Sequence, residues 1–190
     1  MTTGRHEPAG AEPVTVLRTT HEQEITQRAL REVMARFATG ITVLTARGGR
    51  LAHAMTANAF TSVSLDPPMV LCCVARTARM HEAILDASGF GVSMLSSEQE
   101  SLARHFADRD RPTGMAQFDR LDWFPGSRTG TPLLSGALAW LECDLAEVYE
   151  GGDHSIFLGL VRGASRGDGQ TLLFLDGGFH RYDPPTARSA

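Results

Sequence analysis

The chain has 190 residues, is 42% apolar and carries a formal net charge of −4. This size predicts one domain with its own core, and the lack of a basic surplus argues against nucleic acid as a partner. No apolar run approaches the ~18 residues that a membrane-spanning helix needs, so no membrane association is expected. Residues 1–20 lack the apolar segment of a signal peptide and are expected to be a flexible tail, as are residues 185–190, which leaves 21–184 as the domain.

The three cysteines are Cys72, Cys73 and Cys143. An odd number, two of them adjacent, provides neither a disulfide framework nor a CxxC metal motif. We interpret all three as reduced core residues of a cytoplasmic protein. The seven histidines are widely spaced and no HExxH motif occurs, so no metal site is predicted.

The first expected element is a helix that ends before Gly40, a residue type suited to the position just past a helix. Thr20 and Gln23 fit a capping box at its start. Apolar residues recur every four positions from Ile25 to Phe37, as on one face of a helix.

Strand patterns follow. The β-branched segment 41–46, the turn at 47–50 and the return segment 51–55 predict a hairpin. Residues 60–65 alternate apolar and hydroxyl side chains, but the phase changes, which indicates a bend or bulge near Thr61.

The sequence Asp66-Pro67-Pro68 then breaks the chain. The apolar segment 69–75 predicts a strand that is buried on both faces. A helix is expected over 77–88, with Thr77 as its N-cap and Gly89 at its end. The remaining expectations are a strand at 90–95, a helix at 96–107, an irregular segment at 108–135, a long strand at 136–150, its hairpin partner at 155–165 and a last strand at 171–176.

Six or more strands joined by hairpins, with inserted helices and no regular βαβ alternation, predict a mainly β fold with an antiparallel sheet. A closed or half-closed barrel would accommodate so many strands in one small domain. Several common enzyme motifs are missing: GFGVSM at 89–94 lacks the third glycine of a dinucleotide fingerprint, and there is no P-loop and no nucleophile elbow around Ser93.

The segment MTANAFTSVSLDPP, residues 55–68, contains four hydroxyl side chains and one asparagine, and its only charge is Asp66. Uncharged donors and acceptors on a bent segment suit a flat heterocycle. The start of the 77–88 helix offers unpaired N–H groups, the positive end of the helix dipole and Arg79, which suit a phosphate. Together these features describe a flavin nucleotide site, although alone they also fit a polar strand face and a solvated arginine.

Six segments of the chain carry a family resemblance: FATGITVLT (37–45), MTANAFTSVSLDPPMVLCCV (55–74), FGVSMLS (90–96), LARHFA (102–107), PLLSGALAWLECD (132–144) and GDHSIFLGLV (152–161). Together they resemble the short-chain flavin reductase family. The resemblance implies an antiparallel split β-barrel, usually a homodimer, that transfers hydride from NADH or NADPH to FAD or FMN. It also implies a partner, the flavin-dependent monooxygenase that receives the reduced flavin.

The resemblance also implies site residues. His154 is the candidate catalytic residue, which would orient the nicotinamide rather than act as an obligatory base. Ala78 and Met80 stand where relatives often carry serine, which leaves the preference between FAD and FMN open. The implied cofactor contacts are Thr56, Ala57, Asn58 and Ala59 on the ring and ribityl chain, their continuation at Ser62, Ser64, Leu65 and Asp66, the phosphate segment Ala78, Arg79 and Met80, further contacts at His105 and Phe106, and the turn Gly152, Asp153 and His154.

Two other classes of function stay open at this stage. A flavin-binding redox-sensing module would bind flavin without turnover, and a small barrel could serve as a scaffold or bind heme. Flavin-dependent NADH oxidation separates the reductase from both.

Overall fold

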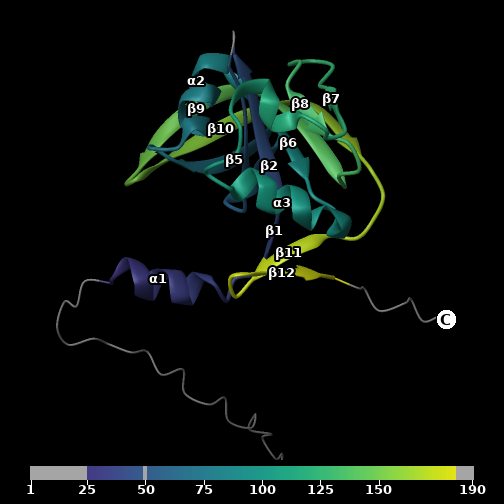
Figure 1. Ribbon diagram of the computed structural model, residues 1–190. Coiled ribbons are helices and arrows are strands. Elements are labelled where there is room, and N and C mark those ends of the chain that lie inside the picture. The colour runs from purple at the N-terminus through teal and green to yellow at the C-terminus, as the bar shows by residue number, and fades with distance from the viewer. Residues whose placement is uncertain (1–24, 49–50, 183–190) are drawn as a thin grey trace, which may run out of the picture.

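The computed structural model describes residues 25–48 and 51–182 (Figure 1). Its centre is a seven-stranded sheet in the order β3-β2-β6-β9-β10-β5-β4. Every neighbouring pair in this sheet is antiparallel, which confirms the predicted fold class. The strands are β2 (Thr42–Gly48), β3 (Leu51–Ala57), β4 (Phe60–Leu65), β5 (Pro68–Ala75), β6 (Gly89–Met94), β9 (Ala139–Gly151) and β10 (His154–Arg166).

The sheet is not a closed barrel. Strands β3 and β4 follow each other in the chain, yet they form its two opposite edges. The outer edge of β3 is occupied by Gln117, whose side-chain oxygen accepts from the Ala54 amide at 2.9 Å and whose amide group donates to the Ala52 carbonyl at 3.0 Å. These bonds satisfy two backbone polar groups at the open edge of β3.

Strand β2 separates two apolar clusters. Leu44 and Ala46 point into one, under helix α2 (Arg79–Ala87), while Ile41, just before the strand, and Val43 point into the other, under helix α3 (Glu100–Ala107). This alternation explains why nearly the whole strand is buried. The 96–107 prediction is confirmed: Ser96 and Gln99 form a capping box, and a short 3₁₀ helix η1 (Ser97–Gln99) precedes α3.

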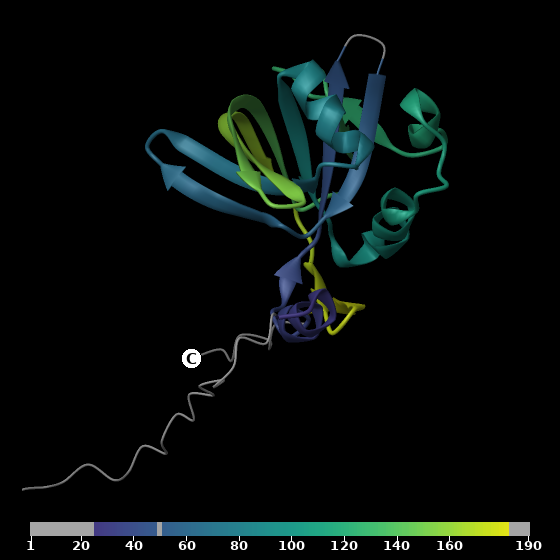
Figure 2. The same cartoon turned by 90° about the vertical axis from the view of Figure 1, so that its left-hand side faces the viewer.

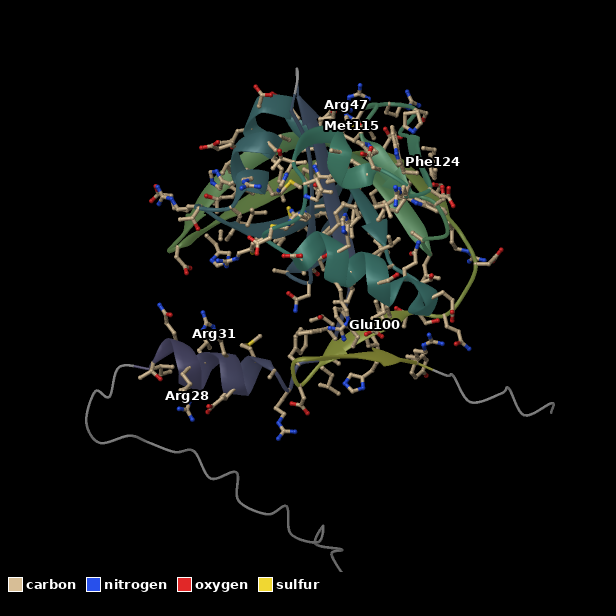
Figure 3. The ribbon with its side chains drawn as sticks, viewed as in Figure 1. Arg28, Arg31, Arg47, Glu100, Met115 and Phe124 are labelled. Carbon is tan, nitrogen blue, oxygen red and sulfur yellow. The ribbon has the colours of Figure 1, made fainter. Side chains whose placement is uncertain are left out.

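Helix α1 (Gln27–Met34) lies apart from the main sheet, beside a small second sheet (Figures 1 and 2). Its N-cap is Thr26, whose hydroxyl accepts from the Ala29 amide at 3.2 Å. The predicted helix is therefore confirmed over this range, while Thr20 and Gln23 lie outside the described residues. None of its residues is buried, and Figure 3 shows Arg28 and Arg31 projecting from opposite sides of the helix.

The chain end does not join the main sheet. Strand β11 (Leu172–Leu175) pairs instead with β1 (Thr39–Gly40) and with β12 (Gly178–Arg181), which was not predicted. This three-stranded sheet ties the segment after α1 to the end of the described chain. A short hydrophobic run predicts a strand but not its partner, so this pairing could not be inferred from the sequence.

Several boundaries differ from the predictions. The N-cap of α2 is Ala78 rather than Thr77, and the helix is terminated by Ser88 in the left-handed region, with φ of 52°. The bend expected near Thr61 is a register shift between Ser62 and Ser64. Residues 108–135 are not wholly irregular, since they contain the 3₁₀ helix η2 (Gly114–Phe118) and the hairpin β7 (Trp123–Pro125) and β8 (Pro132–Leu134).

Glu142 on β9 is a buried carboxylate. The loop between β7 and β8 covers it, and its carboxylate accepts from the amides of Arg128 at 2.9 Å and Thr129 at 2.7 Å. Burial raises the pKa of this carboxyl, but the hydrogen bonds from Thr129 and Arg128 outweigh it and leave the pKa below its ordinary value. The carboxylate thus anchors the loop as a stable anion.

The three cysteines carry free thiols. Cys72 and Cys143 are fully buried, and burial raises the pKa of each to about 12, so neither is a ready nucleophile. Cys73 is only partly buried.

Across the described residues, no helix has both the length and the apolar character that crossing a bilayer requires.

Candidate functional site

Two pockets adjoin the hydroxyl-rich segment. The first, which we call the basic pocket, has a volume of about 410 Å³ and contains three arginines and a histidine. It lies between the end of β3, the start of α2 and the loop after α3. Its lining residues are His53, Met55, Thr56, Ala75, Thr77, Ala78, Arg79, Phe106, Ala107, Arg109 and Arg111.

The second, which we call the apolar pocket, has a volume of about 570 Å³ and contains no charged side chain. Asn58, Ala59, Phe60 and Thr61 line it, so the chain passes from the basic pocket to the apolar one within a few residues. Its other lining residues are Phe37, Ala38, Thr39, Gly40, Ile41, Thr42, Leu71, Cys73, Met94, Leu95, Leu138 and Thr171.

The start of α2 faces the basic pocket. Ala78 provides no side-chain cap, which leaves first-turn N–H groups available to a ligand. Arg79 is exposed and lines the pocket, as predicted for a phosphate contact. The side chain of Met80 is fully buried in the core, so only its backbone amide could meet a phosphate. The predicted phosphate contact at Met80 can therefore involve only the backbone of this residue and not its side chain.

The hydroxyl of Thr56 is committed to the fold. It donates to the Ala103 carbonyl at 2.7 Å and so joins β3 to α3. Asn58 and Ala59 are exposed between the two pockets, whereas Ala57 is buried beside them. A ligand along this segment would therefore meet the Asn58 side chain and the backbone rather than a row of hydroxyls.

The β4 candidates lie elsewhere. Ser62, Ser64, Leu65 and Asp66 are absent from the lining of both pockets. The Ser64 hydroxyl accepts from the Asp66 amide at 3.2 Å, which shapes the turn after the strand. Leu65 is 91% exposed. Of the β4 residues, only Phe60 and Thr61 at the start of the strand line the apolar pocket.

His105 and Phe106 have different surroundings. Phe106 is fully buried and forms part of the wall of the basic pocket. The Nε2 atom of His105 lies 2.9 Å from the Gln117 carbonyl, so this ring fastens α3 to η2. The structure thus places Phe106 at the site, and His105 behind it.

The turn at Gly152, Asp153 and His154 lies beside the basic pocket. His154 pairs with Ala75, a lining residue, and the Arg76 amide donates to the Asp153 carbonyl at 3.0 Å. Nδ1 of His154 donates to the Asp153 carboxylate at 2.8 Å. This hydrogen bond lowers the pKa of Asp153. With Nδ1 engaged, Nε2 is the ring atom that can accept from a ligand. Gly152 has φ of 72°, which favours glycine there.

Several site residues escaped the sequence prediction. His53, Arg109 and Arg111 line the basic pocket, although His53 and Arg111 are far apart in the chain. His81 also matters, because its Nε2 lies 2.8 Å from the Ser155 hydroxyl and so links α2 to β10 next to His154. The only sequence signal for any of these was the segment DRDRPTG (108–114), which fits either a solvated loop or a contact with the adenylate half of FAD. Among the described residues, no group of three or more His, Cys, Asp or Glu could hold a metal ion.

A basic pocket at a helix start and an apolar pocket lined by the same short segment, on an open antiparallel sheet, suit a nucleotide with a flat ring. The chain belongs to the flavin reductase like domain family, which matches residues 34–183.

Individual relatives agree with this assignment. The chain is 51% identical over 156 residues to an NADH-dependent FAD reductase from Streptomyces globisporus, covering 82% of this chain and 85% of the relative. It is 37% identical to the reductase component of 4-hydroxyphenylacetate 3-monooxygenase from Thermus thermophilus, covering 84% of this chain and 99% of the relative.

Among solved structures, the chain is similar to BorF, the flavin reductase component of a bacterial two-component tryptophan halogenase. The TM-score is 0.79 at 50% identity, covering 82% of this chain and 98% of BorF. It is also similar to the NADH:FAD oxidoreductase SgcE6 of Streptomyces globisporus in complex with NAD and FAD fragments. That match has a TM-score of 0.78 at 48% identity and covers 84% of this chain and 94% of the other.

Proposed function

We propose that this protein is an NADH:flavin oxidoreductase that reduces FAD or FMN and supplies the reduced flavin to a partner flavin-dependent monooxygenase. The observation that carries the proposal is that one short segment, residues 55–60, lines both pockets in a chain of this family. Relatives described as NADH-dependent flavin reductases and as reductase components support it.

In this proposal the flavin phosphate lies in the basic pocket, at the start of α2 and beside Arg79. The ring and ribityl chain follow Thr56, Ala57, Asn58 and Ala59 toward the apolar pocket. Flavin supplies the hydride-accepting chemistry when bound. The chain would supply a pocket that orients the flavin ring against the nicotinamide ring of NADH.

His154 orients the nicotinamide. Asp153 fixes its ring through Nδ1, which leaves Nε2 to accept from the carboxamide of NADH. The side chain is 44% exposed, as expected for a group that meets a diffusible substrate. Ser62, Ser64, Leu65 and Asp66 remain in the proposal through the family resemblance alone, because they line neither pocket.

The direct test follows NADH oxidation with FAD, with FMN and without flavin. Turnover that requires added flavin supports the proposal. Tight flavin binding without NADH oxidation would instead indicate a redox-sensing module. A flavin-dependent oxygenase that forms product only when this protein and NADH are present would establish the delivery of reduced flavin.

We also propose that the protein is a homodimer and that α1 packs against a second copy. Leu30 is 53% and Val33 is 69% exposed, which is unusual for large apolar side chains three residues apart on one helix face. Val33→Glu should therefore shift the protein to monomer in light scattering, whereas the control Gln27→Glu on the same helix should not.

The free thiols fit a reducing cytoplasmic location.

A further inference from the structure

The basic pocket holds more positive charge than one phosphate requires. Arg79, Arg109 and Arg111 all line it, and no carboxylate is among its lining residues. A cluster of cations without a lining carboxylate is electrostatically unfavourable, and an anionic ligand relieves the repulsion. The question is what the second and third arginines recognise.

Arg111 is held differently from Arg79. Its guanidinium donates to two backbone carbonyls, those of Asp108 and Ala54, and its Nη2 lies 3.1 Å from Nε2 of His53. All three partners are neutral acceptors, so they fix the position of the group without cancelling its charge. Its Nε atom is buried and has no hydrogen-bond partner among the described residues.

The charges in this pocket interact. Burial and then the nearby charge of Arg79 lower the pKa of Arg111, and the carboxylate of Asp108 offsets part of this shift. Burial followed by the charges of Arg111 and Arg79 lowers the pKa of His53 to about 4. His53 is therefore neutral at physiological pH and can accept from Arg111. The same shifts indicate that Arg79 and Arg111 lie close enough to repel each other in the absence of a ligand.

The two arginines enter from different elements. Arg79 comes from the start of α2, where the flavin phosphate is proposed to lie, and Arg111 comes from the loop after α3, on the β3 side of the pocket. A ligand with a single phosphate can satisfy the first position, whereas a pyrophosphate can extend from the first to the second. This difference distinguishes a dinucleotide from a mononucleotide.

We propose that Arg111, positioned by His53, binds the second phosphate of FAD and thereby sets a preference for FAD over FMN. The inference rests on the proposed flavin binding. It adds that discrimination between the two flavins resides in the loop after α3 and not at the start of α2.

The test measures dissociation constants of FAD, FMN and riboflavin by quenching of flavin fluorescence. A charge-assisted hydrogen bond contributes about 1.5–3 kcal/mol, so Arg111→Gln should weaken FAD by about 10- to 100-fold. FMN should change less than about twofold, and riboflavin not at all. Arg111→Lys keeps the positive charge but loses the planar guanidinium that can form two parallel hydrogen bonds. The FAD affinity of this variant should therefore lie between those of the wild type and of Arg111→Gln.

The control is Arg166→Gln, which removes the same charge from an exposed position at the opposite end of β10 from His154. It should leave every flavin affinity unchanged. The ratio of the FAD and FMN constants is the decisive quantity, because partial unfolding of a variant lowers both affinities and leaves their ratio intact.

Two results would overturn the inference: equal weakening of FAD and FMN by Arg111→Gln, or a raised KM for NADH with an unchanged FAD to FMN ratio. The second result would assign Arg111 to the nicotinamide dinucleotide instead. A wild-type protein that binds none of the three flavins would refute the proposed function itself, which is a separate outcome.

Discussion

The two pockets on either side of residues 55–60 differ in how the fold prepares them. The basic pocket is built from fixed charges, with Arg111 held by backbone carbonyls and His53 at its wall. The apolar pocket contains no charge and is lined by the backbone and small or apolar side chains. One end of the site therefore selects a ligand by charge, and the other selects it by shape and burial.

Because of this difference, the basic pocket should contribute mainly to flavin affinity, and the apolar pocket to the orientation of the reacting ring as well. Interactions with phosphates are remote from the reacting atoms, so they contribute binding energy without touching the ring. Contacts along Asn58 and Ala59 lie where the ring is proposed to bind, so changes there affect orientation as well as affinity. Substitutions at the two ends should consequently have different kinetic signatures.

The largest effect is expected at Asn58, where the segment that lines the basic pocket reaches the apolar pocket. Asn58→Leu removes hydrogen bonds and adds bulk at the entrance of the apolar pocket, which together should cost about 2–4 kcal/mol in flavin binding. FAD, FMN and riboflavin should all weaken, and turnover should fall with them. The melting temperature without flavin should stay near that of the wild type, because Asn58 is exposed. Full activity with altered stability would mean that the segment is only a polar strand face.

The second prediction concerns pH and the empty basic pocket. His53 has its pKa lowered from 6.5 to about 4, so the unfolded chain binds a proton in this window that the folded chain does not. Stability therefore falls as the pH drops from about 6.5 to 4, by up to about 3 kcal/mol from this group. His53→Gln keeps an acceptor for Arg111 but does not titrate.

Urea denaturation across this pH range measures the effect. The stability of the wild type relative to His53→Gln should decline between about pH 6.5 and 4 and be constant above that window. Saturating FAD should reduce the decline, because its phosphates favour protonated His53. Parallel pH profiles for the two proteins would show that His53 is not desolvated as described.

The third prediction concerns the contribution of Arg79 in the basic pocket to phosphate binding. Arg79→Ala should weaken FAD and FMN by a similar factor, about 10- to 100-fold for a charge-assisted hydrogen bond. Riboflavin has no phosphate, and its affinity should stay the same. If riboflavin lost affinity equally, Arg79 would support the fold of the pocket rather than the phosphate. Thermal denaturation of the variant without flavin provides the control for folding.

The smallest effect is expected at His154. A single neutral hydrogen bond contributes about 0.5–1.5 kcal/mol, so His154→Ala should raise the KM for NADH by about 3- to 10-fold. The KM for flavin should hardly change, and kcat should fall less than kcat/KM. Asp153→Asn should reproduce part of this effect, because the ring would lose its fixed orientation. Kinetics of His154→Ala that match the wild type at every NADH concentration would contradict this role.

The local features of the fold were predictable from the sequence for a physical reason. Hydrophobic periodicity and turn residues act over a few positions, and they predicted the β2–β3 and β9–β10 hairpins, the helix at 96–107 and the break after β4. The same local signals placed Arg79 at a helix start and Asn58 on a bent, uncharged segment. These two residues line the pockets as expected of ligand contacts.

Only the tertiary structure decided how distant segments meet. His53 and Arg111 are 58 positions apart, and they come together because Gln117 binds the edge of β3 and brings the loop after α3 with it. The same contact occupies the open edge of β3, and β11 pairs with β1 and β12 in a separate sheet. Strand partners and side-chain bridges depend on long-range geometry, which no local pattern of residues encodes.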